Sequence, residues 1–377
     1  MAATTRLVRA PARWPGHGAL LLLALVPAAF AAGLIVGAAA PLSIAVPGAP
    51  AARAAGLVDP SAPSSDSPSP GASVSGRLVE APETVAPDTT PPSLPEQRVT
   101  SSGARIDEVL ASFAAAGLDP VLVGAGDIAD CITGADMATA RLIDAIPGVV
   151  FTAGDEAYPA GSAEDFSDCY DPSWGRFRDR TLPAIGNHEW GTPNAAGFFG
   201  YFGSERPGQA WYSLDVGAWH VIVLDSDCDI VGCGLGSAQL TWLTADLAAH
   251  PTRCTLAIWH HPRFSSGGHG NDTAVAPFWR ALMRAGADLI VNGHDHDYER
   301  FARQRPSGRR DPRHGIREIV AGTGGAHLRY FHAIKPNSRV RLRTYGVLRL
   351  TLHPASYGWR FIRTDGSTAD AGASACH

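Results

Sequence analysis

The sequence predicts an α/β domain over residues 105–377 of a chain of 377 residues. Two observations lead to this prediction. Short apolar runs rich in β-branched residues alternate with segments whose apolar residues recur at helical spacing, and such alternation is typical of an α/β core. Further β-rich runs are also present, so we expect a second sheet rather than one simple doubly wound sheet.

The individual elements follow from these patterns. Strands are expected at residues 121–125, 149–153, 219–225, 254–259 and 288–292, and helices at 135–146, 237–249 and 273–285. The further β-rich runs cover residues 211–216, 317–321, 346–352 and 357–363.

Residues 1–46 have the outline of an export signal. Arg6, Arg9 and Arg13 come before an apolar stretch at 18–40 that is interrupted only by Pro27. This stretch is longer than the apolar core of most cleaved signals and close to the length that spans a bilayer. Residues 1–46 are therefore predicted to be either a signal peptide, with small residues at 38–40 as a cleavage site, or an N-terminal membrane anchor.

Residues 47–104 are rich in Pro, Ser, Ala and Thr and have almost no aromatic residues. Such a segment cannot bury enough apolar surface to offset the entropy of ordering it. We expect a disordered linker here, followed by one domain. The protein would then be exported, and either secreted or anchored at the outer face of the cytoplasmic membrane.

All six cysteines lie in the predicted domain, and an even number in an exported chain favours disulfides. Cys228 and Cys233 are expected to pair because they close a small loop. We expect the other four to pair as Cys131 with Cys169 and Cys254 with Cys376. A zinc site made of cysteines is disfavoured because no Cys-x-x-Cys occurs.

The net charge of −5 lacks the overall basicity of a nucleic-acid-binding protein, and no nucleic-acid-binding surface is evident. Basic residues are dense between Arg300 and Arg349. This stretch either raises the local concentration of anionic substrates or is a solvated face of an arginine-rich chain. Membrane contact is expected only through residues 1–46, if they are not cleaved, and the oligomeric state is left open.

A recurring pattern follows the predicted strands, in which an apolar run ends, a glycine or tryptophan follows, and side chains that can bind metals come next. The carboxyl ends of parallel strands converge on one crevice, so these side chains are expected to meet. The pattern occurs at Gly126-Asp127, Gly154-Asp155-Glu156-Ala157-Tyr158, Gly186-Asn187-His188-Glu189, Trp259-His260-His261 and Gly293-His294-Asp295-His296.

This ordered set resembles the calcineurin-like metallophosphoesterases, and the resemblance implies a four-layer α/β/β/α sandwich around two metal ions. The common first motif is Asp-x-His, but Ala129 stands at its third position. Tyr158 instead matches the Gly-Asp-x-x-Tyr pattern of the purple acid phosphatase branch. The segment 293–300 also resembles that branch's Gly-His-x-His-x-Tyr-Glu-Arg.

The resemblance implies a ligand set of seven side chains. Asp127, Tyr158 and His296 would bind Fe³⁺, Asn187, His260 and His294 would bind Zn²⁺, Mn²⁺ or Fe²⁺, and Asp155 would bridge the two ions. Hard phenolate and carboxylate oxygens suit Fe³⁺, and imidazoles suit the divalent ions.

Three further histidines have expected roles outside the ligand set. His188 and His269 match positions that contact substrate, where they could stabilise phosphoryl oxygens or protonate the leaving alcohol. His269 could also be a solvated loop residue. His261 is expected to support the site rather than to bind a metal.

The resemblance implies an exported phosphatase that hydrolyses small phosphate monoesters by attack of a metal-bound hydroxide. No nucleophilic Ser, Thr or Cys accompanies the motifs, which agrees with direct attack. A phosphodiesterase or nucleotidase with the same metal site is the alternative. A catalytically silent cell-surface binding module is a third hypothesis.

Overall fold

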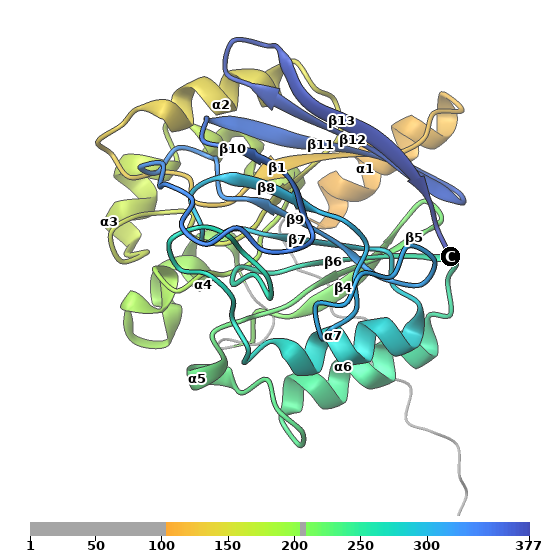
Figure 1. The fold of residues 1–377 in the computed structure, drawn as a ribbon. Helices are drawn as coiled ribbons and strands as arrows, with labels where there is room; N and C mark the ends of the chain where they lie inside the picture. Colours follow the sequence, from red (N-terminus) through yellow and green to blue (C-terminus); the bar gives the residue numbers. More distant parts are fainter. Residues whose placement is uncertain (1–102, 204–208) are drawn as a thin grey trace, which may run out of the picture. The chain divides into compact units, whose positions relative to one another are not determined.

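The computed structural model describes residues 103–203 and 209–377 (Figure 1). The predicted signal or anchor at 1–46 and nearly all of the predicted linker at 47–104 lie outside the described residues. Within the two described ranges, no helix is long and apolar enough to cross a membrane.

Two β-sheets form the centre of the described domain. The first has the strand order β13-β12-β11-β1-β2-β3, and the second has the order β10-β8-β9-β7-β6-β5-β4. The strands of the first sheet are β1 (Val121–Ala125), β2 (Val149–Thr152), β3 (Thr181–Leu182), β11 (Gly346–His353), β12 (Ser356–Arg363) and β13 (Thr368–Ala375). Those of the second are β4 (Tyr212–Val216), β5 (Trp219–Val223), β6 (Cys254–Ile258), β7 (Leu289–Asn292), β8 (Tyr298–Phe301), β9 (Arg317–Ala321) and β10 (Ser338–Leu342).

Each sheet contains a parallel part, formed by β1, β2 and β3 at one side of the first sheet and by β5, β6, β7 and β9 in the middle of the second. The helices are α1 (Gly103–Ala115), α2 (Ala135–Asp144), α3 (Ala163–Asp165), α4 (Ala196–Phe202), α5 (Cys228–Val231), α6 (Ala238–Ala249) and α7 (Ala276–Ala285). The short π- and 3₁₀-helical segments are η1 (Phe166–Tyr170), η2 (Trp174–Arg180), η3 (Glu189–Gly191) and η4 (Pro193–Ala195).

Three apolar clusters define four layers. One cluster joins the facing sides of the two sheets, a second joins the first sheet to α2 and α4, and a third joins the second sheet to α6 and α7. In β1, Leu122 faces the other sheet and Val123 faces α2. In β6, Leu256 faces the other sheet and Ala257 faces α6 and α7. Both faces of these strands are buried, which explains their continuous apolar sequences.

The central elements agree with the sequence prediction to within a few residues, and the fold is the predicted four-layer α/β sandwich. The expected second sheet is confirmed, and the further β-rich runs are divided between the two sheets. Strands β4 and β9 join β5–β7, whereas β11 and β12 pair with β1 in the first sheet. Strand identity is local, but sheet membership depends on long-range pairing that a sequence pattern does not encode.

All three predicted disulfides are present, as Cys131–Cys169, Cys228–Cys233 and Cys254–Cys376. They connect the β1–α2 loop to η1, close the loop around α5, and tie β6 to the end of the chain.

Candidate metal centre

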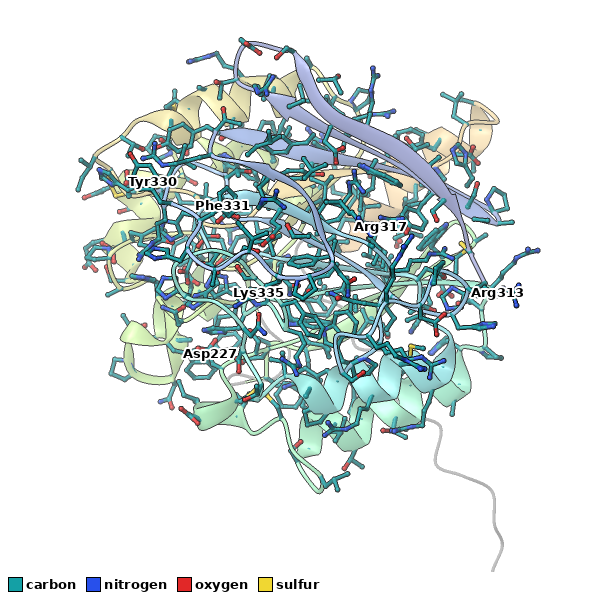
Figure 2. All side chains as sticks on the ribbon, in the orientation of Figure 1. Asp227, Arg313, Arg317, Tyr330, Phe331 and Lys335 are labelled. Carbon is teal, nitrogen blue, oxygen red and sulfur yellow. A yellow bond between two sulfur atoms is a disulfide. The ribbon has the colours of Figure 1, made fainter. Side chains whose placement is uncertain are left out.

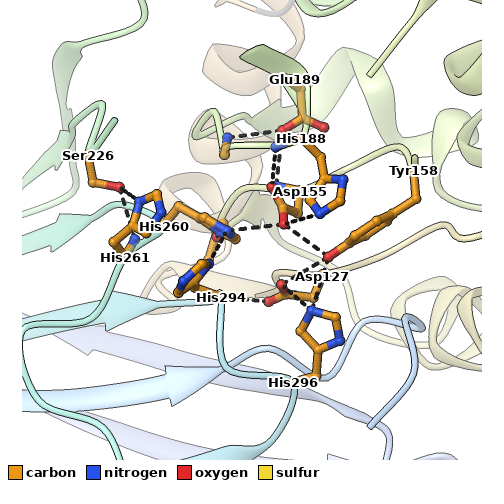
Figure 3. Close-up of polar contacts among 12 residues, drawn as sticks. Asp127, Asp155, Tyr158, His188, Glu189, Ser226, His260, His261, His294 and His296 are labelled. Carbon is orange, nitrogen blue, oxygen red and sulfur yellow. Dashed lines mark hydrogen bonds and ion pairs between the residues drawn. The ribbon is translucent and has the colours of Figure 1, made fainter. Parts of the chain in front are cut away.

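The structure brings most of the predicted site residues together at one end of the parallel strands (Figure 3). Because these strands run in parallel within each sheet, the loops after them emerge at the same edge. Asp127 follows β1, Asp155 and Tyr158 follow β2, Asn187 and His188 follow β3, His260 follows β6, and His294 and His296 follow β7.

The first group of donors surrounds the hydroxyl of Tyr158. This oxygen lies 3.1 Å from Oδ1 of Asp127, 3.0 Å from Oδ2 of Asp155 and 3.2 Å from Nε2 of His296. The His296 nitrogen is in turn 3.2 Å from Oδ1 of Asp127. Three oxygens and one imidazole nitrogen therefore converge on one point, as the ligands of a single ion do.

The second group of donors is formed by His260 and His294, and Asn187 lines a pocket beside it together with His261. Nε2 of His260 lies 3.2 Å from Oδ2 of Asp155 and 3.2 Å from Nδ1 of His294. The side-chain oxygen of Asn187 is buried and has no hydrogen-bond partner. A buried amide oxygen without a donor is costly, and a cation would satisfy it. Oδ2 of Asp155 belongs to both groups, which is the position that a bridging ligand requires.

Backbone carbonyls orient two of the imidazoles. Nδ1 of His260 lies 2.8 Å from the carbonyl oxygen of Ala153, and Nδ1 of His296 lies 2.8 Å from that of His327. Each carbonyl accepts the Nδ1 hydrogen of its imidazole. The Nε2 atom, which faces the carboxylates, then keeps the lone pair that can bind a metal ion. His327, which has no role predicted from the sequence, thus contributes through its main chain.

Three of the donor residues have left-handed backbone conformations. The φ angles of Asp127, Asp155 and His294 are 59°, 53° and 69°. Non-glycine residues rarely adopt such angles, and they persist at functional sites because the surroundings enforce them. Gly154, which precedes Asp155, has φ 81°, and a Cβ atom there would lie 2.5 Å from Nδ1 of His260. Glycine at this position lets β2 approach the imidazole.

Glu189 fixes the backbone around Asp155. Its fully buried carboxylate accepts hydrogen bonds from the amides of Asp155 at 3.1 Å, Ala157 at 3.1 Å and Gly186 at 3.0 Å. The glutamate of the Asn-His-Glu segment therefore joins the loops after β2 and β3. No role was expected for it from the sequence.

The site concentrates buried negative charge. Asp127 and Asp155 are almost fully buried. Burial, followed by the charges of these two carboxylates, raises the pKa of Tyr158 well above 10. Burial lowers the pKa of His260, but the charge and hydrogen bond of Asp155 outweigh it and raise that pKa to about 10. Cations at this position would compensate the carboxylates and favour the ionised phenol. The donor set therefore fits two metal ions.

The structure places His188 and His269 beside the donor groups. The ring of His188 is centred 4.2 Å from that of Tyr158, and its Nε2 lies 3.8 Å from Oδ2 of Asp155. The exposed ring of His269 is centred 4.1 Å from that of His294. The ring of His261 is centred 4.2 Å from that of His294, and its Nδ1 lies 2.9 Å from the hydroxyl of Ser226. His261, expected only to support the site, also lies close enough to His260 and His294 for the three imidazoles to hold one ion.

Two acidic residues of the last motif hold the loop that carries His269. Asp295 accepts hydrogen bonds from the amides of His269 at 2.8 Å and Gly270 at 3.2 Å and from the hydroxyl of Ser265. Glu299 accepts from the amide and hydroxyl of Ser266 at 2.7 and 2.6 Å. These are positioning residues that the sequence pattern does not reveal, because their role appears only when the loop after β6 and the loop after β7 are side by side.

Part of the basic stretch after His296 is used within the fold. Arg300 forms an ion pair with Asp370 at 2.6 Å, and Arg305 forms one with Asp311 at 2.8 Å. The Arg317 guanidinium, labelled in Figure 2, donates to the carbonyl oxygen of Phe301 at 2.9 Å. These partners favour a structural role for this part of the stretch over the attraction of substrate.

Comparison with known proteins gives consistent results. The family model for calcineurin-like phosphoesterases matches residues 118–298. The chain is 33% identical over 121 residues to purple acid phosphatase 18 of Arabidopsis thaliana, covering 30% of this chain and 26% of that protein. It is 27% identical over 278 residues to a nucleotide pyrophosphatase/phosphodiesterase of Hordeum vulgare, covering 60% and 72%.

A solved structure shares the fold. The purple acid phosphatase from yellow lupin (Lupinus luteus) seeds aligns with a TM-score of 0.56 at 18% identity, covering 68% of this chain and 53% of that chain. The chain thus spans only about a quarter of the Arabidopsis protein and about half of the lupin structure.

Proposed function

Because residues 118–298 form a calcineurin-like phosphoesterase domain of the purple acid phosphatase-like branch, we propose that this protein hydrolyses phosphate esters with two metal ions. The observation that carries the proposal is the shared oxygen of Asp155, which is 3.0 Å from the Tyr158 hydroxyl and 3.2 Å from Nε2 of His260. One carboxylate oxygen between two donor groups is suited to hold two cations a short distance apart.

The donor chemistry suggests which ions are bound. Asp127, Tyr158 and His296 would hold Fe³⁺, because phenolate and carboxylate oxygens are hard ligands. Asn187, His260 and His294 would hold Zn²⁺, Mn²⁺ or Fe²⁺, and Asp155 would bridge. When bound, such a pair polarises the phosphoryl group, activates a water and neutralises developing charge.

The chain's own residues would position the substrate and move the protons. His188 and His269 flank the two donor groups and could donate to phosphoryl oxygens or protonate the leaving alcohol. The hydroxyls of Ser265 and Ser266 donate to Asp295 and Glu299 and are fully buried, so neither is presented as a nucleophile. We therefore propose direct hydrolysis with no phosphoenzyme.

We propose a phosphate monoesterase as the main activity. The similarity to a nucleotide pyrophosphatase/phosphodiesterase keeps a diesterase or nucleotidase as the second candidate. The purified, metal-loaded protein should release phosphate from p-nitrophenyl phosphate faster than it cleaves bis-p-nitrophenyl phosphate or ATP. A faster reaction with the diester or ATP would favour the second candidate, and inactivity on all three with metal bound would favour a silent binding module.

The proposed cellular setting is outside the cytoplasm. Residues 1–46 would act as a signal peptide or anchor, 47–104 as a linker and 105–377 as the catalytic domain. The three disulfides support this proposal, since such bonds persist in oxidising compartments.

A further inference from the structure

A pocket of about 430 Å³ opens beside the second group of donors. Asn187 and His261 form part of its wall, and the His261 ring lies 4.2 Å from that of His294. A phosphate bound at the centre would therefore have this pocket next to it, within reach of the group esterified to the phosphate.

The polar wall of the pocket is acidic. It contains Asp227, Asp229 and Asp272, and none of the described residues that line it is a lysine or an arginine. The cation that acts on Asp272 is Arg263, whose guanidinium packs over the ring of Phe264 at 4.6 Å and is not part of the lining. Asp227 stands at the start of α5 and is labelled in Figure 2.

Asp227 distinguishes the pocket from an ordinary acidic surface, because it places a buried carboxylate in the wall. The residue is 9% exposed, and its Oδ2 atom is buried without a hydrogen-bond partner. A buried carboxylate oxygen without a partner is costly, and a bound donor or cation would remove that cost. Burial, and then the charge of Asp225, raises the pKa of Asp227 to about 8, and a bound ammonium would favour its ionised form. Trp190 and Ile230 add aromatic and aliphatic surface to the same wall.

The opposite side of the centre has a different character. Arg329 is bonded through its amide to the carbonyl of His296 at 3.0 Å, and its side chain approaches the loop that carries His269. The basic side suits the phosphate, and the acidic pocket suits a positive charge on the other end of the substrate. A second phosphate in the pocket would meet acidic side chains and, among the lining residues, no lysine or arginine.

We propose that this pocket selects phosphate monoesters whose alcohol carries an ammonium group, such as phosphoethanolamine, over uncharged and polyphosphate substrates. The inference rests on the proposed function, because it places the phosphate at the metal centre. Carboxylates that attract a primary ammonium, beside an aromatic surface, are a common way to recognise a cation. A neutral polyol would not balance the charge of these carboxylates.

Binding of two non-hydrolysable ligands to the metal-loaded full chain tests the proposal. 3-Aminopropylphosphonate has the length and charge of phosphoethanolamine, and butylphosphonate replaces the ammonium by a methyl group. By calorimetry, the amine should bind about tenfold more tightly than the butyl compound. In the double variant Asp227→Asn/Asp272→Asn, the ratio should approach one while butylphosphonate binds as before.

A matched control removes two carboxylates outside the pocket, as Glu164→Gln/Asp168→Asn, and should keep the full ratio. Equal binding of both ligands by the unmodified protein, or a preference that survives in the Asp227/Asp272 variant, would overturn the proposal. Turnover of p-nitrophenyl phosphate by the same preparations distinguishes failure of the pocket proposal from failure of the proposed hydrolase activity. Turnover without preference for the amine overturns the pocket proposal alone. Preference for the amine without turnover overturns the proposed hydrolase activity alone.

Discussion

The hydroxyl of Tyr158 lies 3.0 Å from Oδ2 of Asp155, and the same carboxylate oxygen is 3.2 Å from Nε2 of His260. A single side chain therefore connects the donors of both proposed ions. Removal of this oxygen should affect the two ions together, because neither group is complete without it.

We expect Asp155→Asn to lose most of both metals and to lower kcat by about a thousandfold or more, since the amide carries no charge and offers one oxygen. Elemental analysis beside a phosphate-release assay measures both effects. A variant that retains both ions and near-normal turnover would show that Asp155 is not the bridge.

Gly154→Ala should weaken the second metal site. The new Cβ would lie 2.5 Å from Nδ1 of His260, in a residue with φ 81°. Gly366 has φ 82°, and a Cβ atom there would have nothing within 4 Å, so Gly366→Ala is the matched control. The control should lose about 1 kcal/mol of unfolding free energy from backbone strain, and Gly154→Ala about 2 to 4 kcal/mol. Urea denaturation and zinc titration check this, and equal losses would contradict it.

Asp295→Ala should disturb catalysis without removing metal. The change deletes the acceptor for the amides of His269 and Gly270 and for the hydroxyl of Ser265. With this loop released, we expect kcat/KM to fall by about a hundredfold while metal content stays unchanged. If kcat/KM is unaffected, the loop does not contribute to the reaction; if metal is lost as well, Asp295 supports the ligands directly.

The pair of His220 and Asp246, on β5 and α6, should make stability depend on pH. Burial lowers the pKa of His220, but the hydrogen bonds and charges of Asp246 and then Asp215 outweigh it and raise that pKa above 6.5. The folded state therefore prefers protonated His220. This stabilisation is complete below the unfolded pKa of about 6.5 and is lost as pH rises through the raised folded value.

Urea denaturation between about pH 5 and 9 tests this expectation. The unmodified protein should lose stability as pH rises above about 6.5, and His220→Asn should lose less over the same range. Identical pH profiles would assign the dependence to other groups.

Much of the candidate metal centre could be predicted from the sequence because its proposed ligands follow strands. Val121–Ala125 and Leu289–Asn292 are recognisable as buried strands, one in each sheet. The residues that follow each strand lie at the same end of that sheet as those that follow its parallel neighbours. Ala129, at the position where the common motif has a histidine, and Tyr158 can also be read directly from the sequence. The structure adds the geometry, in which Asp155 belongs to both donor groups.

Other features depend on contacts that no local pattern carries. Strand β13 has the sequence TADAGASA and an exposed pattern, so it has little β-propensity and forms because it pairs with β12. The acidic pocket combines Asp227 and Asp272 from loops after β5 and β6, and Asp295 is recognisable as a positioning residue only from its contacts with the His269 loop.

Metal content measured together with the visible absorption spectrum of the purified protein tests whether Asp127, Tyr158 and His296 hold iron beside a second ion. We expect two metal ions per chain, one of them iron, and a violet colour from charge transfer between the Tyr158 phenolate and Fe³⁺. Tyr158→Phe should lose the colour and keep the second ion. A colourless, iron-free protein with full phosphatase activity would contradict the assignment of Fe³⁺ to these three ligands.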